Sequence, residues 1–274
     1  MFFALTWAVV WSLLLPMGAF VRAIRTRVPG VLARPAASRL IQRHGARFES
    51  LRVYAPSLAI LLAGIAATLF IGENFVELAV RMRANSPAVL NIDQRAFSLA
   101  SGLRSSSSTL FFTAFTIAGS PVGLGVIAVA AALFVGRRHR GLAMYIVATA
   151  AAGGLLEMGL KMMFARTRPN LETALRAAHG YSFPSGHAMG STIVCGALAY
   201  VVARSSRPWR FRSLSIAFLV SAVLAIGMSR VYLGVHWLSD IAAGVAAGLV
   251  WLIVATVTFE MIGRLYRIRR QRSR

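Results

Sequence analysis

Long apolar runs separated by short basic clusters make up most of this 274-residue chain. A membrane-spanning helix needs about 20 mostly apolar residues, and seven stretches of the sequence approach or exceed that length. They run over residues 3–21, 55–79, 111–136, 142–163, 187–204, 213–229 and 237–263. Small residues recur inside these stretches, and such residues let helices approach closely in lipid. The pattern predicts an all-α fold, a polytopic bundle of membrane helices.

The first apolar stretch, residues 3–21, admits three interpretations. A signal peptide carries positive charge before its apolar core, whereas here Arg22, Arg25 and Arg27 come after it. We therefore expect a spanning helix whose N-terminus lies outside. The alternative is a re-entrant or interfacial helix that breaks at Pro16.

Eight arginines lie between residues 22 and 54, interspersed with apolar side chains. This composition fits an amphipathic helix on the anionic inner leaflet, which Pro29 and Pro35 would confine to the second half of the stretch. A solvated loop whose charge only orients the chain fits it equally well. The sequence thus divides into residues 1–54, the membrane-embedded residues 55–263 and a basic tail, residues 264–274.

Composition excludes an ordinary soluble domain. Apolar residues make up 57% of the chain and charged residues 14%, whereas soluble domains average roughly 45–50% and about 25%. The 30 basic and 8 acidic residues give a net charge of +22, which raises the question of nucleic-acid binding. We expect no nucleic-acid partner, because little soluble surface remains to carry such a site. The single Cys195 excludes an internal disulfide and cannot alone supply the thiolates of a structural zinc or iron–sulfur site.

The basic residues are distributed unevenly between the two sides of the predicted bundle. Residues 22–54 and every second connection after them hold 21 of the 30 basic residues, and the other connections hold nine. Connections rich in arginine and lysine face the cytoplasm. We therefore expect residues 22–54 and the C-terminal tail inside, and the connections near 164–186 and 230–236 outside.

The two outer connections carry an unusual set of ionisable residues. Lys161 is the only lysine, against 29 arginines. Charged groups beside lipid are costly and therefore mark functional sites by default. Three cations, two imidazoles and one carboxylate lie on this membrane face, a set that suits a phosphate group. These residues are Lys161, Arg168, His187, Arg230, His236 and Asp240.

Local geometry favours anion binding at two of these points. Lys161 and Arg168 are seven residues apart, so they share a helix face if the helix persists, although Pro169 disfavours helix at the residue before it. Ser185 and Gly186 directly precede an apolar run, where the free N–H groups and the dipole of a starting helix attract anions. Gly186 also lets the backbone approach a phosphate closely.

His236 and Asp240 are four residues apart, which places them on one face of a helix. The carboxylate would accept a hydrogen bond from one ring nitrogen and leave the other nitrogen free to attack. The third member of a catalytic triad orients a histidine in this way; here the imidazole itself would be the nucleophile. Taken alone, Asp240 would equally serve as a helix cap, and Lys161 would only snorkel to the headgroups.

Three further ionisable residues lie near the outer connections. Glu157 precedes Lys161 by four residues and would pair with it as structural support. His179 either touches the substrate headgroup or is an ordinary surface histidine. Glu172 is the remaining carboxylate of the loop, and we expect no catalytic role for it.

Two larger features of the outer side are also ambiguous. The stretch 80–110 is either a headgroup-selecting lid or a plain connector. Its charged residues are Arg81, Arg83, Asp93, Arg95 and Arg104. Aromatic residues around the motifs either line a lipid entrance or form an ordinary interfacial belt. They are Tyr181, Phe183, Tyr232 and Trp237.

As a set, the spaced residues resemble the three-part signature of the type 2 phosphatidic-acid phosphatase superfamily, a group of integral-membrane lipid phosphatases. That signature reads K-x6-R-P, then P-S-G-H, then S-R-x5-H-x3-D. It is complete here in the segments Lys161–Pro169, Pro184–His187 and Ser229–Asp240. Three motifs with matching spacing are far more specific than one short motif. The resemblance implies a six-helix phosphatase core, to which residues 3–21 add one N-terminal apolar segment.

The resemblance assigns a role to each motif residue. His236 would attack phosphorus and form a phosphohistidine, and Asp240 would orient it. His187 would protonate the leaving oxygen and then activate water. Such enzymes stabilise the charge of the in-line transition state without a metal or other cofactor. The phosphoryl oxygens would be held by Lys161, Arg168, Ser185, Gly186 and Arg230.

The resemblance therefore implies a metal-independent hydrolase of a lipid phosphate or diphosphate. The distribution of basic residues places its site at the outer face of the membrane, and the arginine- and alanine-rich composition suggests a bacterial cytoplasmic membrane. Undecaprenyl diphosphate is the first choice of substrate, beside phosphatidylglycerol phosphate, phosphatidic acid and lipid A phosphates. The nearest alternative is a lipid phosphotransferase that uses the same phosphohistidine. A transporter or a non-catalytic membrane protein is a more distant alternative, because transporters place polar residues near mid-membrane, whereas these residues lie at helix ends.

Overall fold

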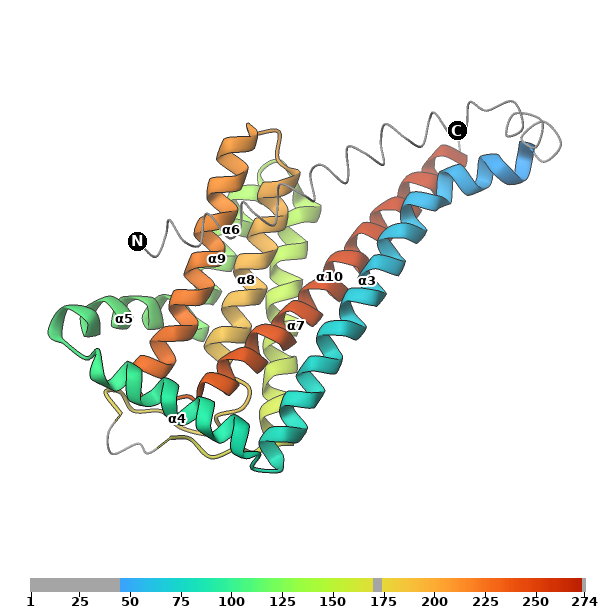
Figure 1. Ribbon diagram of the computed structural model, residues 1–274. Helices are drawn as coiled ribbons and strands as arrows, with labels where there is room; N and C mark the ends of the chain where they lie inside the picture. The colour runs from blue at the N-terminus through green and yellow to red at the C-terminus, as the bar shows by residue number, and fades with distance from the viewer. Residues whose placement is uncertain (1–44, 170–173, 273–274) are drawn as a thin grey trace. The chain divides into compact units, whose positions relative to one another are not determined.

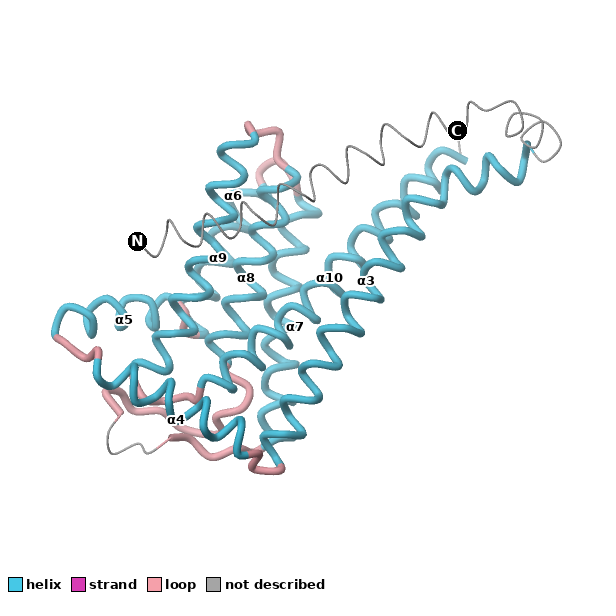
Figure 2. Tube along the Cα trace, in the orientation of Figure 1, coloured by secondary structure: helices cyan, strands magenta, loops and turns pink. Residues whose placement is uncertain are grey.

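The computed structural model describes residues 45–169 and 174–272. All regular elements in this part of the chain are α-helices, as the sequence predicts (Figures 1 and 2). The predicted segment 3–21, residues 22–44 of the arginine-rich stretch, and Glu172 lie outside the described residues.

The described helices follow one another with short connections. They are α3 (Gly45–Arg83), α4 (Pro87–Gly102), α5 (Ser106–Ala118), α6 (Pro121–Gly136), α7 (Arg140–Phe164), α8 (Gly186–Arg204), α9 (Trp209–Tyr232) and α10 (Leu238–Arg272). The second half of the arginine-rich stretch is helical from Gly45 onward and continues into the first described span. Helix α4 occupies most of the stretch 80–110, which the sequence left open as a lid or a connector.

Five of these helices are long and apolar enough to cross a membrane. The spans are Ser57–Arg83, Arg140–Phe164, Gly186–Arg204, Trp209–Tyr232 and Leu238–Gln271. Large apolar side chains point outward on the helices; Leu69, Phe70 and Phe134 are 67%, 70% and 73% exposed. Water would penalise such surfaces, whereas lipid does not. The helices predicted over 55–79, 142–163, 187–204, 213–229 and 237–263 are confirmed.

The predicted segment 111–136 is not one continuous helix. The apolar run consists of α5 and α6, which together are apolar enough to span but are bent by 59° at their junction. Ser120 caps α6 by accepting a hydrogen bond from the Gly123 backbone N–H at 3.1 Å, and Pro121 begins the helix. A capping serine followed by proline starts a new helix, because proline cannot continue the preceding hydrogen-bond ladder.

The chain divides into two compact units, the larger of which comprises residues 66–259. The described part of the smaller unit consists of residues 45–65 at the start of α3 and residues 260–272 at the end of α10. Within this smaller unit Arg264 Nη1 donates to Ser57 Oγ at 3.5 Å. The motif residues all belong to the larger unit.

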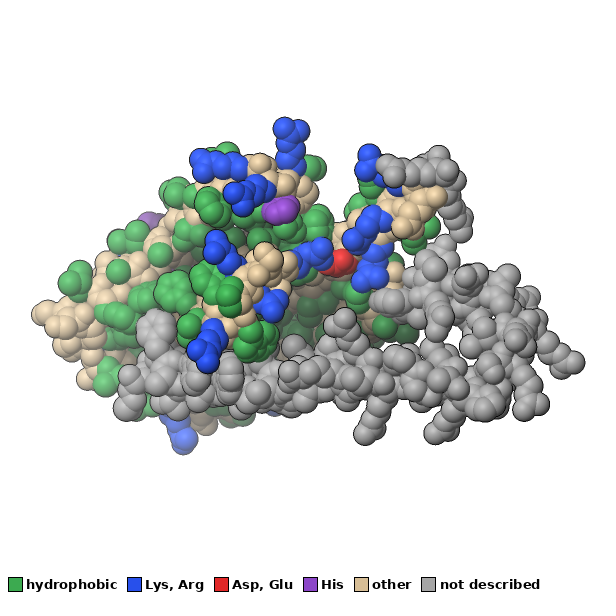
Figure 3. Space-filling view, turned by 90° about the horizontal axis from the view of Figure 1, so that it is seen from above, with side chains coloured by type: hydrophobic (Ala, Val, Ile, Leu, Met, Phe, Trp, Pro, Cys, Tyr) green, Lys and Arg blue, Asp and Glu red, His purple; other side chains and the backbone are tan. Residues whose placement is uncertain are grey.

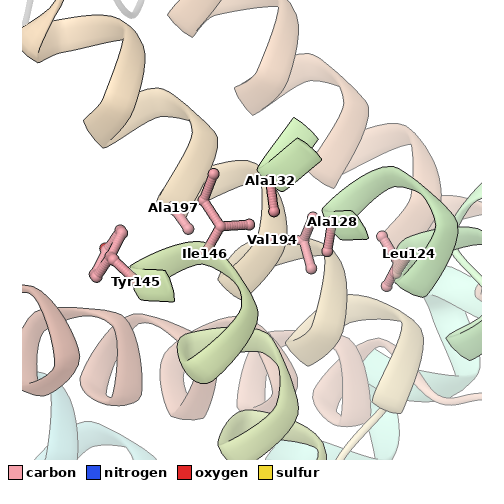
Figure 4. Packing of buried hydrophobic residues seen from close by; sticks show 7 residues of the cluster. All are labelled: Leu124, Ala128, Ala132, Tyr145, Ile146, Val194 and Ala197. Atoms are coloured by element: carbon pink, nitrogen blue, oxygen red, sulfur yellow. The ribbon is translucent and has the colours of Figure 1, made fainter. Parts of the chain in front are cut away.

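Close helix packing defines the centre of the larger unit. Leu124, Ala128 and Ala132 of α6 meet Tyr145 and Ile146 of α7 and Val194 and Ala197 of α8 (Figure 4). Nearer the motif residues, α10 lies so close to α8 that a Cβ added at Gly244 would be 2.6 Å from the Ser185 carbonyl oxygen. A glycine is therefore needed there, and it holds the start of α10 beside the start of α8.

The connections of the larger unit sort into two ends. The α7–α8 connection, the α9–α10 connection and α4 gather at the lower end of Figure 2. The α6–α7 and α8–α9 connections lie at the opposite end, and Figure 3, which looks onto that end, shows many basic side chains on its surface. The exposed arginines of these two connections are Arg137, Arg138, Arg140, Arg204, Arg207 and Arg210.

Candidate active site

Helix α7, which carries Lys161 of the first motif, ends at Phe164, before it reaches Arg168. Ala165 adopts a left-handed conformation, with φ 47°, and ends α7 at Phe164. The helix does not persist to Arg168, so the condition under which Lys161 and Arg168 would share a helix face is not met. The proline after Arg168 is one physical reason. Lys161 Nζ lies 2.9 Å from Glu157 Oε1, which is the ion pair that the spacing predicts.

Arg168 is held by backbone carbonyl groups. Its side chain donates to Gly180 O at 3.0 Å, Val235 O at 2.8 Å, His179 O at 2.9 Å and Tyr181 O at 3.2 Å. These bonds fix the guanidinium between its own loop and the α9–α10 connection. Burial lowers the pKa of Arg168, and the nearby Asp240 carboxylate raises it. The His179 side chain is exposed, so only the backbone of this residue contributes.

His236 lies between Arg168 and Asp240. Its Nδ1 is 3.3 Å from Asp240 Oδ2, and its Nε2 is 3.1 Å from Arg168 Nη1. A guanidinium can only donate, so Nε2 accepts this bond and the ring proton sits on Nδ1, facing the carboxylate. The side chain is 2% exposed. The arrangement presents the Nε2 lone pair of a neutral imidazole to the cationic side of the site.

Electrostatics keep His236 neutral near pH 7. Burial lowers the pKa of His236 from 6.5 to about 4. The hydrogen bond and the charge of Asp240 act in the opposite direction, while the positive charges of Arg168 and Arg230 lower the pKa further. A neutral imidazole is the form that can attack an electrophile.

Asp240 makes the contacts required for both roles that the sequence left open. Its Oδ2 accepts the Trp237 backbone N–H at 3.0 Å, which caps the start of α10, and also faces His236. Its Oδ1 accepts Arg166 Nη1 at 2.6 Å. The carboxylate is fully buried, with 0% exposure. Protein groups, and not water, therefore set the orientation of the Asp240 carboxylate.

Sequence reasoning missed Arg166 and treated Asp93 only as part of a lid or connector. Arg166 Nη2 lies 2.9 Å from Asp93 Oδ2, while its Nη1 also reaches Ser239 Oγ at 2.7 Å. One available signal was that Arg166 lies inside the spacer of the first motif, two residues before Arg168. In a chain with 29 arginines this signal is weak.

The second motif starts α8, as predicted. Gly186 is the first helical residue and Ser185 the N-cap, but the Ser185 hydroxyl is buried and has no hydrogen-bond partner. The Ser185 backbone N–H donates to the Asp240 carbonyl at 3.0 Å, which ties the second motif to the third. A Cβ added at Gly186 would collide with the Glu157 carboxylate, so a larger residue here would force the Glu157 side chain to move.

His187 and Arg230 meet at Thr116, a residue that sequence reasoning did not single out. His187 Nε2 lies 3.2 Å from the Thr116 carbonyl oxygen, which is free because it is in the last turn of α5. Arg230 Nη1 donates to Thr116 Oγ1, while Arg230 Nε is buried and has no partner. Since a carbonyl only accepts, the His187 proton sits on Nε2 and its Nδ1 is the free ring position of the neutral imidazole.

The structure gathers all eight predicted site residues at one end of the larger unit. His187 is close enough to Lys161, Arg230 and His236 to interact with them electrostatically. Three cationic side chains, one helix N-terminus and an unpartnered hydroxyl surround the two imidazoles. Such a set can bind a phosphoryl group and move protons around it.

Two of the four aromatic residues fit neither predicted role. Phe183 is fully buried, with ring centroids 5.9 Å from Phe75 and 4.9 Å from Phe164. Tyr232 is also buried, and its hydroxyl lies 2.7 Å from Ser108 Oγ. Both residues support the site from the interior, so a lipid entrance or interfacial belt made of them is wrong. Trp237 packs on Phe97 of α4 instead.

An apolar cavity of about 270 Å³ opens beside the second motif. It lies between α6, α7 and α8 and reaches Glu157 and Gly186 at one end. Small side chains keep it open. They include Gly125, Ala128, Ala150, Ala151, Gly154 and Gly190.

Two bacterial proteins resemble about two fifths of this chain. Phosphatidylglycerophosphatase B of Bacillus subtilis is 32% identical over 112 residues, 40% of this chain and 54% of that protein. A putative undecaprenyl-diphosphatase, YbjG, of Escherichia coli is 34% identical over 110 residues, 38% of this chain and 51% of that protein. The chain thus spans about half the length of each of these relatives.

A solved structure extends the likeness to the fold. The transmembrane PAP2-type phosphatidylglycerolphosphate phosphatase from Bacillus subtilis superposes with a TM-score of 0.62 and 26% identity, covering 71% of this chain and 96% of that one. Residues 142–264 match the family model described as the PAP2 superfamily. The resemblance drawn from the three motifs is confirmed. The chain therefore carries a PAP2 superfamily domain within an integral membrane protein.

Proposed function

We propose that this protein hydrolyses a lipid phosphate or diphosphate through a phosphohistidine at position 236. The observation that carries the proposal is the pairing of His236 Nδ1 with Asp240 at 3.3 Å, which leaves Nε2 directed at the cationic side of the site. A buried neutral imidazole with a carboxylate behind it is a competent nucleophile.

In the first step, His236 Nε2 attacks phosphorus and the bond from phosphorus to the lipid oxygen breaks. His187 gives a proton to that oxygen. From a lipid monophosphate the lipid leaves as a neutral alcohol. From a lipid diphosphate it leaves as a lipid monophosphate, with one negative charge fewer than if the oxygen had stayed unprotonated. The Nε2–H of His187 is engaged by the Thr116 carbonyl at 3.2 Å, so the transferred proton comes from Nδ1. Because the unliganded His187 is neutral and carries no proton on Nδ1, it must gain a second proton there before this step. The negative charge of the bound phosphate favours this protonated form. The positive charge that develops on His236 is stabilised by Asp240.

In the second step, water attacks the phosphohistidine. His187, now neutral, accepts a proton from the water, and the P–N bond breaks. Inorganic phosphate leaves and His236 returns to its neutral form with the proton still on Nδ1. Using one residue as acid and then as base follows from microscopic reversibility.

The phosphoryl oxygens would be held by groups that are already assembled. Arg168, Arg230 and Lys161 supply charge, and the Ser185 hydroxyl and Arg230 Nε are buried polar groups without partners in this state. Such groups are costly unless a ligand satisfies them. Because three cations balance the phosphoryl charge, the scheme requires no metal ion.

The apolar cavity supports a lipid rather than a soluble substrate. It adjoins Gly186 and is lined mainly by small apolar side chains, which suit a hydrocarbon chain beside a polar headgroup. The relatives' names point to phosphatidylglycerol phosphate and undecaprenyl diphosphate, and we propose the diphosphate as the first substrate to assay. The arginine distribution supports a site on the outer face of a bacterial cytoplasmic membrane, with the C-terminus inside.

The direct test is phosphate release by the purified protein in detergent. The panel contains undecaprenyl diphosphate, phosphatidylglycerol phosphate, phosphatidic acid and a lipid A phosphate, each with and without excess chelator. We expect release from at least one lipid, unaffected by the chelator. His236→Ala should reduce the rate by about 10⁴-fold or more, whereas His139→Ala, an exposed histidine at the opposite end, should leave it unchanged.

Three outcomes would contradict the proposal. Substantial turnover by His236→Ala would remove it as nucleophile, and a strict magnesium requirement would contradict the metal-free scheme. Transfer of labelled phosphate to a second lipid, with none released, would make the protein a phosphotransferase instead.

A further inference from the structure

A buried chain of charged groups extends behind the His236–Asp240 pair. Asp240 Oδ1 lies 2.6 Å from Arg166 Nη1, and Arg166 Nη2 lies 2.9 Å from Asp93 Oδ2. Asp93 also accepts the Ser239 hydroxyl at 2.6 Å and the Ser239 backbone N–H at 2.8 Å. The Arg166 guanidinium is thus shared between two carboxylates, Asp93 and Asp240. In the sequence, Asp93 is 146 residues from Ser239, whereas Asp240 directly follows it.

All members of this chain are withdrawn from solvent. The side chains of Asp93, Asp240 and Arg166 are 1%, 0% and 11% exposed. Electrostatic interactions between such groups are screened weakly. A buried charge left without its partner is also costly, so each group constrains the others.

The helix that carries Asp93 is anchored to the same region. Phe97 of α4 packs against Trp237, with ring centroids 6.0 Å apart, and Arg166 lies over the Trp237 ring at 5.9 Å. Ala100 of α4 belongs to a buried cluster with Ala188 and Ile241. Asp93 is therefore held in place by its helix and not only by the arginine it contacts.

We propose that Asp93 is a positioning residue for the nucleophile, acting through Arg166 on Asp240. This proposal rests on the proposed phosphohistidine chemistry of His236. Asp93 touches neither the substrate nor His236. It sets the orientation and the effective charge of the carboxylate that does face His236.

The physical reason is charge balance. Asp93, Arg166 and Asp240 together carry a net charge of −1 (two carboxylates and one guanidinium). When His236 becomes positively charged during attack, this net negative charge stabilises it. Without the Asp93 charge, Arg166 would neutralise Asp240 alone, and the developing positive charge would face a neutral pair.

The test substitution is Asp93→Asn, which keeps the side-chain shape and removes the charge. We expect kcat to fall by about 10-fold, in line with the usual cost of disturbing a positioning group, while KM changes less than about twofold. The matched control is Gln94→Lys, which shifts the charge of the same helix by the same amount on an exposed side chain. It should leave both parameters unchanged.

A double-mutant cycle separates positioning from a general loss of stability. If Asp93 acts through Asp240, Asp93→Asn should lower the residual rate of Asp240→Asn by less than about threefold. A full 10-fold loss in that background would overturn the proposal, as would wild-type kcat in the single variant. Absence of phosphatase activity in the wild-type protein would instead be a failure of the proposed function.

A second variant covers the case in which Asp93→Asn does not fold. Ser239→Ala removes the hydroxyl that links Asp93 to Arg166 and leaves all three charges in place. We expect kcat to fall about threefold at unchanged KM, the effect of one hydrogen bond to charged groups. Because the charges are intact in this variant, unchanged kcat would overturn the claim that Asp93 sets the orientation of Arg166 and Asp240.

Discussion

At the residue scale, the two ring nitrogens of His236 have partners of opposite charge. Asp240 binds Nδ1 and Arg168 approaches Nε2. This asymmetry fixes the tautomer without help from solvent, since the side chain is buried. Arg168 must move away from Nε2 before the attack. An anionic phosphoryl group would attract the guanidinium and so free the Nε2 lone pair.

The first prediction at this scale concerns Asp240→Asn. The amide can still cap α10 but cannot stabilise a positively charged imidazole. We expect kcat to fall on the order of 100-fold or more, with a change in KM of less than about threefold. Steady-state kinetics in detergent measures both. An unchanged kcat would make Asp240 a helix cap only.

The second prediction concerns pH. Burial lowers the pKa of His236 to about 4, and the neutral form, which is the nucleophile, is lost as pH falls through that value. The contribution of His236 to kcat/KM should therefore stay constant from pH 7 to about 5 and decline only near pH 4.

The Asp240→Asn variant tests whether His236 is the group that causes this pH dependence. The Asp240 carboxylate raises the pKa of His236, so removing its charge should move the acid limb to still lower pH. A limb near pH 6.5 that moves in this variant would contradict the buried neutral nucleophile.

Sequence predicts these residues unevenly for a physical reason. His236 and Asp240 are four residues apart, so helical geometry alone brings them together. Arg166 and Asp93 are separated by 73 residues, and His187 and Thr116 by 71. No local periodicity encodes contacts between residues so far apart in the chain. The sequence therefore does not single out Thr116 or Arg166.

At the element scale, short breaks in apolar helices position the site. The bend between α5 and α6 frees the Thr116 carbonyl for His187. The left-handed Ala165 ends α7 and lets Arg168 turn back toward the α9–α10 connection. Hydropathy detects the apolar runs but is insensitive to such breaks, so the third segment was predicted as one helix.

A prediction at this scale concerns the cavity between α6, α7 and α8. Gly154→Leu would fill part of it, because no atom lies within 4 Å of a Cβ added there. Excluding about two methylene groups of a lipid tail should raise KM about 10-fold. A short-chain, water-soluble phosphate ester should be hydrolysed as before.

Gly159→Leu is the matched control for this substitution. It lies on the same helix, is exposed, and is outside the cavity. Equal KM values for both variants with a long-chain substrate would show that the cavity does not hold the tail.

At the scale of the whole molecule, the described connections separate by charge and chemistry. The motif residues lie at one end of the larger unit, and the arginine-rich α6–α7 and α8–α9 connections lie at the other (Figures 2 and 3). The order and number of the apolar segments predicted this arrangement well, because a bilayer forces alternate connections to opposite sides.

The orientation can be tested with single cysteines. The native Cys195 is buried, so a membrane-impermeant maleimide reports mainly on introduced thiols. In intact cells, Ala177→Cys in the α7–α8 connection should be labelled, and Arg138→Cys in the α6–α7 connection should be labelled only after permeabilisation. The reverse pattern would place the site inside.

The most direct measurement of the central claim is to trap the phosphoryl group on the enzyme. Protein mixed with substrate labelled on the reacting phosphate and quenched in alkali should carry label that is stable to base and released by acid, as expected of a phosphohistidine. Peptide mapping should place it at His236, and His236→Ala should carry none. Label at another residue, or full turnover by an enzyme that never becomes labelled, would contradict the account.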